Sequence, residues 1–145
     1  MRSKVLNETG DRTYALIFDT GEEPLSGITQ FAEAHNLSAS RITAIGALSE
    51  VTLGFFDWQK KDYKRIHIQE QVEVLALLGD IALHEEKPKV HAHLVVGLRD
   101  GRARGGHLLK AIVRPTLEVI LTESPGYLKR EHDPESGLAL IRIGS

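Results

Sequence analysis

The 145-residue chain contains no cysteine. This absence excludes disulfide bonds, thiol nucleophiles, iron–sulfur clusters and every zinc site that uses thiolate ligands. A metal bound to this chain must therefore be held by imidazole or carboxylate groups. The sequence has seven histidines that could serve as ligands. They are His35, His67, His84, His91, His93, His107 and His132.

A strong charge of one sign and a long hydrophobic run are missing as well. The 18 basic and 20 acidic residues leave a net charge of −2, whereas non-specific nucleic-acid binders need a positive excess to neutralise phosphates. The longest apolar run, residues 74–78, is far shorter than the roughly 20 residues of a membrane helix. No apolar segment follows the charged first residues, as a signal peptide would require. We expect a cytoplasmic protein without a membrane segment.

The rest of the composition is that of a globular protein. Apolar residues make up 41% of the chain and charged residues 26%, which is typical of a chain that folds around a hydrophobic core. The length suits one folding unit, so we expect residues 1–145 to form a single domain.

One segment has the pattern of an amphipathic helix, and most others have the pattern of strands. Apolar residues at three- and four-residue spacing predict a helix over residues 23–37, with Pro24 in its first turn and Asn36 as its candidate stop. The predicted strands cover residues 13–19, 41–48, 51–58, 63–71, 71–83, 89–98, 106–113, 116–122 and 138–143. The mostly apolar segment 71–83 is expected to be covered on both faces. One clear helix among many short strands favours an α+β fold with a mainly antiparallel sheet.

Two histidines, His91 and His93, alternate with apolar residues in a predicted strand. They would point to the same face about 6.6 Å apart, which lets both reach one ion. His107 lies beyond a hairpin turn and pairs with His93 in only one register. A three-residue loop over residues 99–101, ending on a left-handed glycine, gives that register, and a bulge at Gly105-Gly106 is the alternative.

Three histidines without a fourth protein ligand leave a coordination position open, as in catalytic zinc sites. Zinc is the first expectation, and other divalent transition metals also accept imidazole. His84 is a candidate for a residue that contacts a metal ligand without binding the metal itself. His35, His67 and His132 show only the pattern of ordinary surface or hydrogen-bonded histidines, which is also the competing interpretation of the three candidate ligands.

A series of motifs occurs in the same order as in a known family. They are Gly46–Gly54, Glu73–Ala82, Pro88–His93, Asp100–Leu109, Val113–Ile120 and Arg130–Leu138. Together they resemble the PPC domain, which is conserved in plants and prokaryotes, over nearly the whole chain. The resemblance implies an α+β fold of antiparallel strands, similar to that of acetolactate decarboxylase, and a homotrimer. It also implies a zinc site on His91, His93 and His107.

The resemblance further implies a DNA-binding or regulatory role. In plants the domain accompanies AT-hook motifs, and this chain has none, because Arg114-Pro115 lacks the flanking glycine and basic residues. Basic clusters at residues 60–65 and 99–104 are the candidate phosphate contacts. The alternative to phosphate binding is that each cluster consists of turn residues exposed to solvent.

An enzyme is the alternative function. A zinc-dependent lyase or hydrolase would bind a small carbonyl or carboxylate substrate at the metal. Glu73 and Glu118 are candidate proton shuttles, since each lies in an otherwise apolar strand. Arg104 and Arg114 are candidate partners of a substrate carboxylate. A metal with a purely structural role at a trimer interface is a third interpretation.

Overall fold

A computed structural model describes residues 1–7 and 10–143 of the chain. Within this part, one helix and nine strands are present, and the predicted α+β class is confirmed. The elements are β1 (Arg2–Asn7), β2 (Arg12–Asp19), α1 (Pro24–Ala34), β3 (Ala39–Asp57), β4 (Asp62–Ile68), β5 (Val72–His84), β6 (Lys87–Gly97), β7 (Ala103–Glu123), β8 (Lys129–His132) and β9 (Ala139–Arg142). No helix among the described residues is long and apolar enough to cross a membrane.

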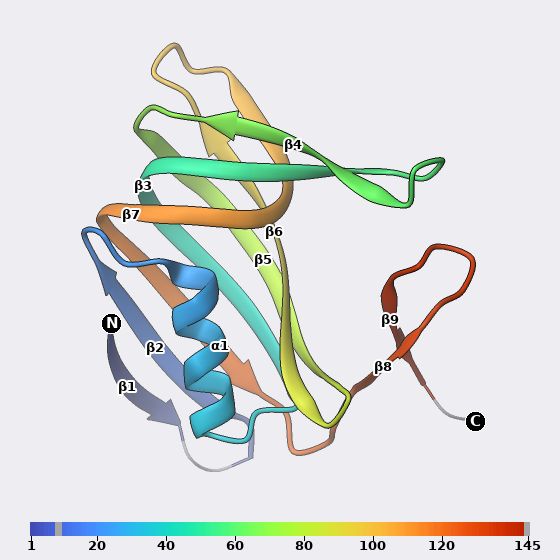
Figure 1. Cartoon of the computed structure of the whole chain (residues 1–145). Coiled ribbons are helices and arrows are strands. Elements are labelled where there is room, and N and C mark those ends of the chain that lie inside the picture. Colours follow the sequence, from blue (N-terminus) through green and yellow to red (C-terminus); the bar gives the residue numbers. More distant parts are fainter. Residues whose placement is uncertain (8–9, 144–145) are drawn as a thin grey trace.

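All nine strands belong to one strongly bent sheet (Figure 1). The longest strands, β3 and β7, pair with each other along both of their halves. The first half of β7 also pairs with β6, and its second half pairs with β2. Because β6 also pairs with β5, and β5 with β3, the sheet curls and brings the start of β7 beside β6.

The bend of β3 depends on Gly46. The register of β3 shifts at this residue against both β5 and β7, and the φ of Gly46 is +151°. A Cβ at this position would lie 2.3 Å from the backbone carbonyl oxygen of Thr116. Only glycine accommodates this conformation and this close approach. The residue therefore allows β3 to continue through the bend as one strand.

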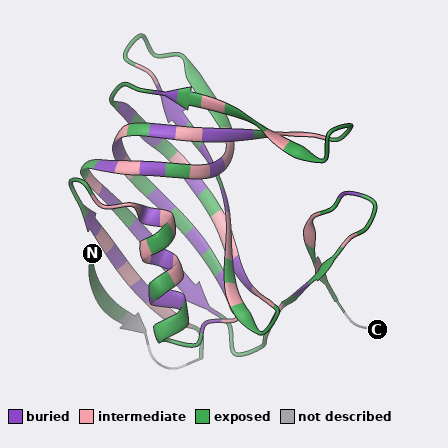
Figure 2. Ribbon diagram, in the orientation of Figure 1, coloured by how far each residue is buried: buried purple, intermediate pink, exposed green. Residues whose placement is uncertain are grey.

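The hydrophobic core lies between α1 and one face of the sheet (Figure 2). Alternate residues of the long strands are buried, because successive side chains of a strand point to opposite faces. Ile28 of α1 and Leu117 of β7 are among the fully buried residues. Glu23 caps α1 by accepting a hydrogen bond from the Ser26 backbone at 2.7 Å. It also accepts one from the Ala111 backbone at 3.3 Å, which ties the helix to β7.

The helix ends at Ala34, three residues before the expected boundary at Leu37. Asn36, the residue expected to stop the helix, takes a positive φ of 52° just beyond its end, so that prediction is confirmed. The prediction that both faces of segment 71–83 are covered is wrong within the single chain. Its burial alternates, and Leu78 is 62% exposed.

The strand boundaries also need correction. The predicted strands 41–48 and 51–58 form the single strand β3, and 106–113 and 116–122 form the single strand β7. The predicted gaps at Ser49-Glu50 and Arg114-Pro115 do not end the strands, because pairing between β3 and β7 resumes beyond each irregularity. β1 and β8 lie outside the predicted strands because neither has an alternating apolar pattern.

Candidate metal centre

The hairpin between β6 and β7 decides whether the three histidines meet. The backbone N–H of Leu98 donates to the carbonyl of Arg102 at 2.8 Å, and Gly101 takes a left-handed φ of +82°. These features define the predicted three-residue loop. The loop places His93 directly opposite His107, and the β6–β7 ladder runs without a bulge. The predicted register is confirmed through the first of the two expected devices.

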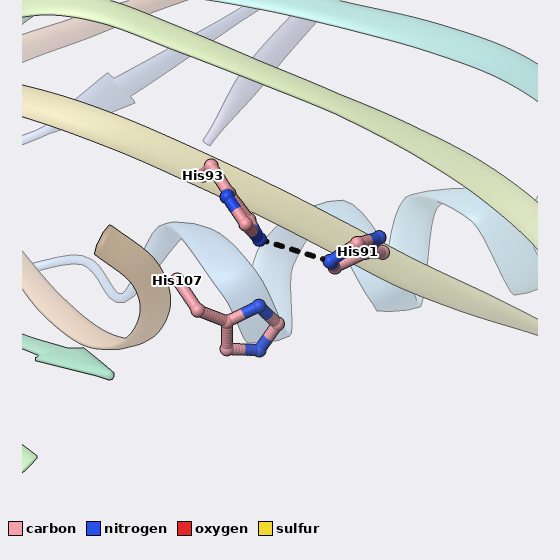
Figure 3. Close-up of side chains that lie close together, drawn as sticks. All are labelled: His91, His93 and His107. Atoms are coloured by element: carbon pink, nitrogen blue, oxygen red, sulfur yellow. Dashed lines mark hydrogen bonds between the residues drawn. The ribbon is translucent and has the colours of Figure 1, made fainter. Parts of the chain in front are cut away.

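His91, His93 and His107 point toward one another outside the hydrophobic core (Figure 3). The alternate residues Ala92 and Leu94 are buried in the core. One nitrogen from each imidazole lies within 4.8 Å of the other two. The Nε2 atoms of His91 and His93 are 3.1 Å apart. Two nitrogens bound to one tetrahedral zinc ion are separated by about 3.3 Å, so these atoms already have the spacing of shared ligands.

His107 is the most enclosed of the three histidines. Its ring stacks on Tyr63 of β4, with ring centroids 4.6 Å apart and an interplanar angle of 19°. Its Nδ1 atom is buried and has no hydrogen-bond partner within the described part of the chain. A buried polar atom without a partner is unfavourable, and binding to a metal ion would satisfy it. The donor set therefore fits a metal with imidazole ligands.

The surroundings of His93 and His107 favour their neutral forms. Burial lowers the pKa of His107 to about 4, and the charges of His91, His93 and Lys89 contribute to this shift. Burial and the neighbouring His91 also lower the pKa of His93. Neutral imidazole is the form that binds metal, so these side chains need not lose a proton near pH 7.

A buried ion pair supports His91 from behind. Oδ2 of Asp80 lies 3.7 Å from Nδ1 of His91, and Oδ1 of Asp80 accepts a hydrogen bond from the guanidinium of Arg130. Burial raises the pKa of Asp80, but contacts with His91 and Arg130 outweigh it and hold that pKa below its ordinary value. Arg130 also donates to the carbonyl oxygen of Ala139 at 3.1 Å. A carboxylate behind a histidine ligand fixes the tautomer and orientation of its ring.

Sequence reasoning missed Asp80 and Arg130. The β5–β6 turn has two residues, Glu85 and Glu86, both with positive φ, and this turn pairs Asp80 directly with His91. A two-residue turn at Glu85-Glu86 fixes the register of β5 against β6. Counting pairs back from this turn could have identified Asp80 as the partner of His91. Arg130 belongs to the last of the family motifs, residues 130–138, but no local pattern placed it beside Asp80, because β8 pairs with the end of β5 from far along the chain.

The four candidate catalytic residues are not part of this cluster. Glu73 lies opposite Gly97, in a separate hollow near the end of β6. Arg104 lies three residues from His107 and therefore on the other face of β7. Glu118 and Arg114 are exposed farther along β7. None of the four lines the hollow beside the histidines.

His35, His67 and His84 lie outside the cluster. His35 stacks on Phe31 with ring centroids 3.9 Å apart. His67 lies 3.0 Å from the hydroxyl of Thr52. His84 lies at the end of β5 opposite Lys87 and does not join the cluster.

Comparison with known families explains this arrangement of motifs. Residues 6–125 match the model of the Plants and Prokaryotes Conserved (PCC) domain, which is the PPC domain named above. The chain belongs to this family. The resemblance inferred from the sequence is thereby confirmed.

Solved structures of PPC-like proteins share the fold. A PPC protein from Pyrococcus horikoshii is 33% identical with a TM-score of 0.86, over 92% of this chain and 93% of that one. A metal-containing protein from Archaeoglobus fulgidus is 31% identical with a TM-score of 0.84, over 98% and 97%. A candidate DNA-binding protein from Bacteroides thetaiotaomicron is 26% identical with a TM-score of 0.87, over 97% and 96%.

A longer relative contains a similar region. The bifunctional protein GlmU from Synechococcus sp. (strain JA-3-3Ab) is 33% identical to this PPC chain over 135 residues. The match covers 91% of this chain and 20% of that protein. The PPC chain therefore corresponds to about a fifth of the longer relative.

Proposed function

We propose that this PPC protein binds one divalent metal ion per chain through His91, His93 and His107. The observation that carries the proposal is the convergence of three imidazole nitrogens within 4.8 Å of one another. The metal-containing relative from Archaeoglobus fulgidus supports it. Zinc is our first choice because three neutral imidazoles suit it, and nickel, copper or iron would also accept this donor set.

The ligand set determines what such a centre can do. A bound zinc ion would act as a Lewis acid toward a molecule at its open position. The protein's own contribution is to hold three imidazole rings in place. Asp80 orients His91, and Tyr63 covers one face of His107. This arrangement supports a lyase or hydrolase acting on a small carbonyl or carboxylate, and the similarity to the acetolactate decarboxylase fold remains a prediction.

Elemental analysis of the purified protein tests the proposal. We expect about one equivalent of transition metal per chain, and well below that amount in the His91→Ala variant. A parent protein that stays metal-free after incubation with zinc and gel filtration would contradict the proposal. The His67→Ala variant is the matched control, since His67 lies on β4 outside the cluster.

Asp80 provides a separate prediction. The Asp80→Asn variant keeps the size of the side chain but loses the charge that faces His91 and Arg130. We expect metal affinity to fall by about 10- to 100-fold, as is usual when a residue that orients a ligand is changed. Competition with a chromogenic chelator measures the affinity. An unchanged affinity would show that Asp80 serves only to pair with Arg130.

The metal-free protein should lose stability in acid. The pKa of His107 is about 4 in the folded chain against an ordinary value of 6.5, so the unfolded state binds the proton more readily. The free energy of unfolding should therefore decrease as the pH falls from about 6.5 to about 4. Urea unfolding of chelator-treated protein at several pH values measures this slope. The His107→Gln variant should show a smaller slope than the parent.

A DNA-binding or regulatory role is the second candidate, and it is favoured by the relative from Bacteroides thetaiotaomicron. The structure gives direct contact limited support, because Arg102 in the basic cluster at residues 99–104 is already paired with Asp100 at 2.6 Å. Binding of duplex DNA as a function of salt is the test. Direct phosphate contacts should give a steep loss of affinity with salt, and a flat dependence would exclude them.

An exposed apolar face supports the proposed homotrimer. The face of the sheet turned away from the core carries five exposed aliphatic side chains. They are Ile45, Leu75, Leu78, Val95 and Ile120. Contiguous exposed apolar residues often mark an interface between subunits. We expect light scattering to give a trimer for the parent and a smaller mass for Leu78→Asp, and a monomeric parent would contradict the proposal.

A further inference from the structure

A small hollow adjoins the histidine cluster. It has a volume of about 160 Å³ and lies between the β6–β7 hairpin, β4 and the C-terminal hairpin of β8 and β9. Its polar lining residues are Tyr63, Lys89, His91, His107 and Arg130. We infer that this hollow binds a small carboxylate anion, which Lys89 and Arg130 recognise while it occupies the open position of the metal. The inference rests on the metal site proposed above.

The charges around the hollow favour an anion. Lys89 lies two residues before His91 on β6, so its side chain points to the same face as the proposed ligands. The positive charge of Lys89 acts on His107. No acidic residue is among the described residues that line the hollow. Asp80, which contacts the lining residues His91 and Arg130, is paired with Arg130. The positive charge of Lys89, and that of a bound metal, are therefore left for a ligand.

Arg130 supplies a second observation that points to a ligand. Its side chain is only 6% exposed. Two of its nitrogens are used, one on Asp80 and one on the carbonyl of Ala139. Its Nε atom is buried and has no hydrogen-bond partner in the described residues. Arg130 lines the hollow, and a guanidinium in the wall of a cavity is suited to a carboxylate oxygen.

The size and the walls of the hollow restrict the ligand further. A volume of about 160 Å³ corresponds to roughly five water molecules, since one water takes up about 30 Å³ in the liquid. Four apolar or small residues complete the lining. They are Val90, Leu138, Ala139 and Leu140. A carboxylate with a short carbon chain matches both the charged and the apolar side of this space better than inorganic phosphate.

Pyruvate and its neutral analogue pyruvamide provide the test. The two molecules have similar shapes, so a difference in affinity reports the charge. Binding to the cobalt-substituted protein is followed by its visible absorption spectrum, and binding to the zinc-loaded protein by calorimetry. We expect pyruvate to bind at least tenfold more tightly than pyruvamide, and inorganic phosphate to bind more weakly than pyruvate. Equal affinities for pyruvate and pyruvamide would overturn the inference.

Two lysine variants make the test specific to this hollow. Lys89→Gln should weaken pyruvate binding about tenfold, as expected for loss of a charge-assisted hydrogen bond. Lys87→Gln is the matched control, because Lys87 lies on the same strand but does not line the hollow. Both variants should keep the metal content of the parent. Equal effects of the two substitutions on pyruvate binding would also overturn the inference.

Metal analysis separates failure of this inference from failure of the metal site. A protein that holds metal but shows no Lys89-dependent binding of pyruvate overturns the inference alone. A protein that holds no metal overturns the metal site. In that case the carboxylate site stands only if calorimetry still detects Lys89-dependent pyruvate binding to the metal-free protein, and it falls otherwise.

Discussion

The His107→Ala variant is expected to bind zinc more than 100-fold more weakly than the parent protein. Replacing a residue that only orients a ligand costs about 10- to 100-fold in affinity, so removal of a ligand should cost more. His107 comes from β7, whereas the other two candidate ligands come from β6. His91 and His93 alone would offer the zinc ion two imidazole ligands in place of three, and would therefore bind it more weakly. This variant therefore tests whether the two strands act together on one ion.

Competition with a chelator of known affinity measures this effect for parent and variant under the same conditions. His67→Ala is the matched control, because His67 is an exposed histidine of β4 that lies outside the cluster, with its ring 3.0 Å from the hydroxyl of Thr52. We expect parent-like affinity for that control. Equal weakening in both variants would point to a general effect on folding, and no weakening in His107→Ala would remove His107 from the site.

The Glu123→Ala variant should lower the free energy of unfolding by about 3–5 kcal/mol. Glu123 is 3% exposed at the end of β7. Its carboxylate accepts hydrogen bonds from the backbone of Ser38 at 2.8 Å, from the backbone of Ala39 at 3.2 Å, and from the hydroxyl of Ser40. These bonds fasten the start of β3 to the end of β7. Alanine would leave several buried donors without an acceptor, which costs about 1–3 kcal/mol for each.

Urea unfolding at a fixed protein concentration measures the loss, because the stability of an oligomer depends on its concentration. Glu123→Gln should lose less than Glu123→Ala, since the amide oxygen still accepts from Ser38 or Ala39. Glu131→Ala on β8 is the control for loss of an exposed glutamate, and a change within about 0.5 kcal/mol is expected there. A change as small in Glu123→Ala would show that solvent replaces the carboxylate.

Local chemistry was sufficient to predict the central hairpin. The alternation of His91 and His93 with apolar residues placed both on one face, because a strand repeats every two residues. The glycine in the turn made a three-residue loop available, and that loop sets the register that brings His107 to His93. The absence of cysteine then limited the ligands to nitrogen and oxygen. The α+β class followed in the same way from short-range patterns.

Short-range patterns failed where strands bend. Ser49-Glu50 and Arg114-Pro115 separated predicted strands, yet β3 and β7 continue past them as single strands. A local pattern does not show that a neighbouring strand keeps pairing on the far side of a bend. The same limit applies to Glu73, Glu118, Arg104 and Arg114. The strands that carry these four residues were predicted. The residues nevertheless lie on the other face of the sheet, or farther along a strand, than the histidines.

The sequence by itself determined the candidate ligands, the strand that carries two of them and the two devices that could align the third. Tertiary structure alone decided what surrounds them. Tyr63 reaches His107 from β4, and Arg130 reaches Asp80 from the C-terminal hairpin. Tyr63 and Arg130 are far from the histidines along the chain, and only the curling of the sheet and the placement of β8 bring them together. Hairpin geometry follows from a few adjacent residues, whereas these long-range contacts depend on how the whole core packs.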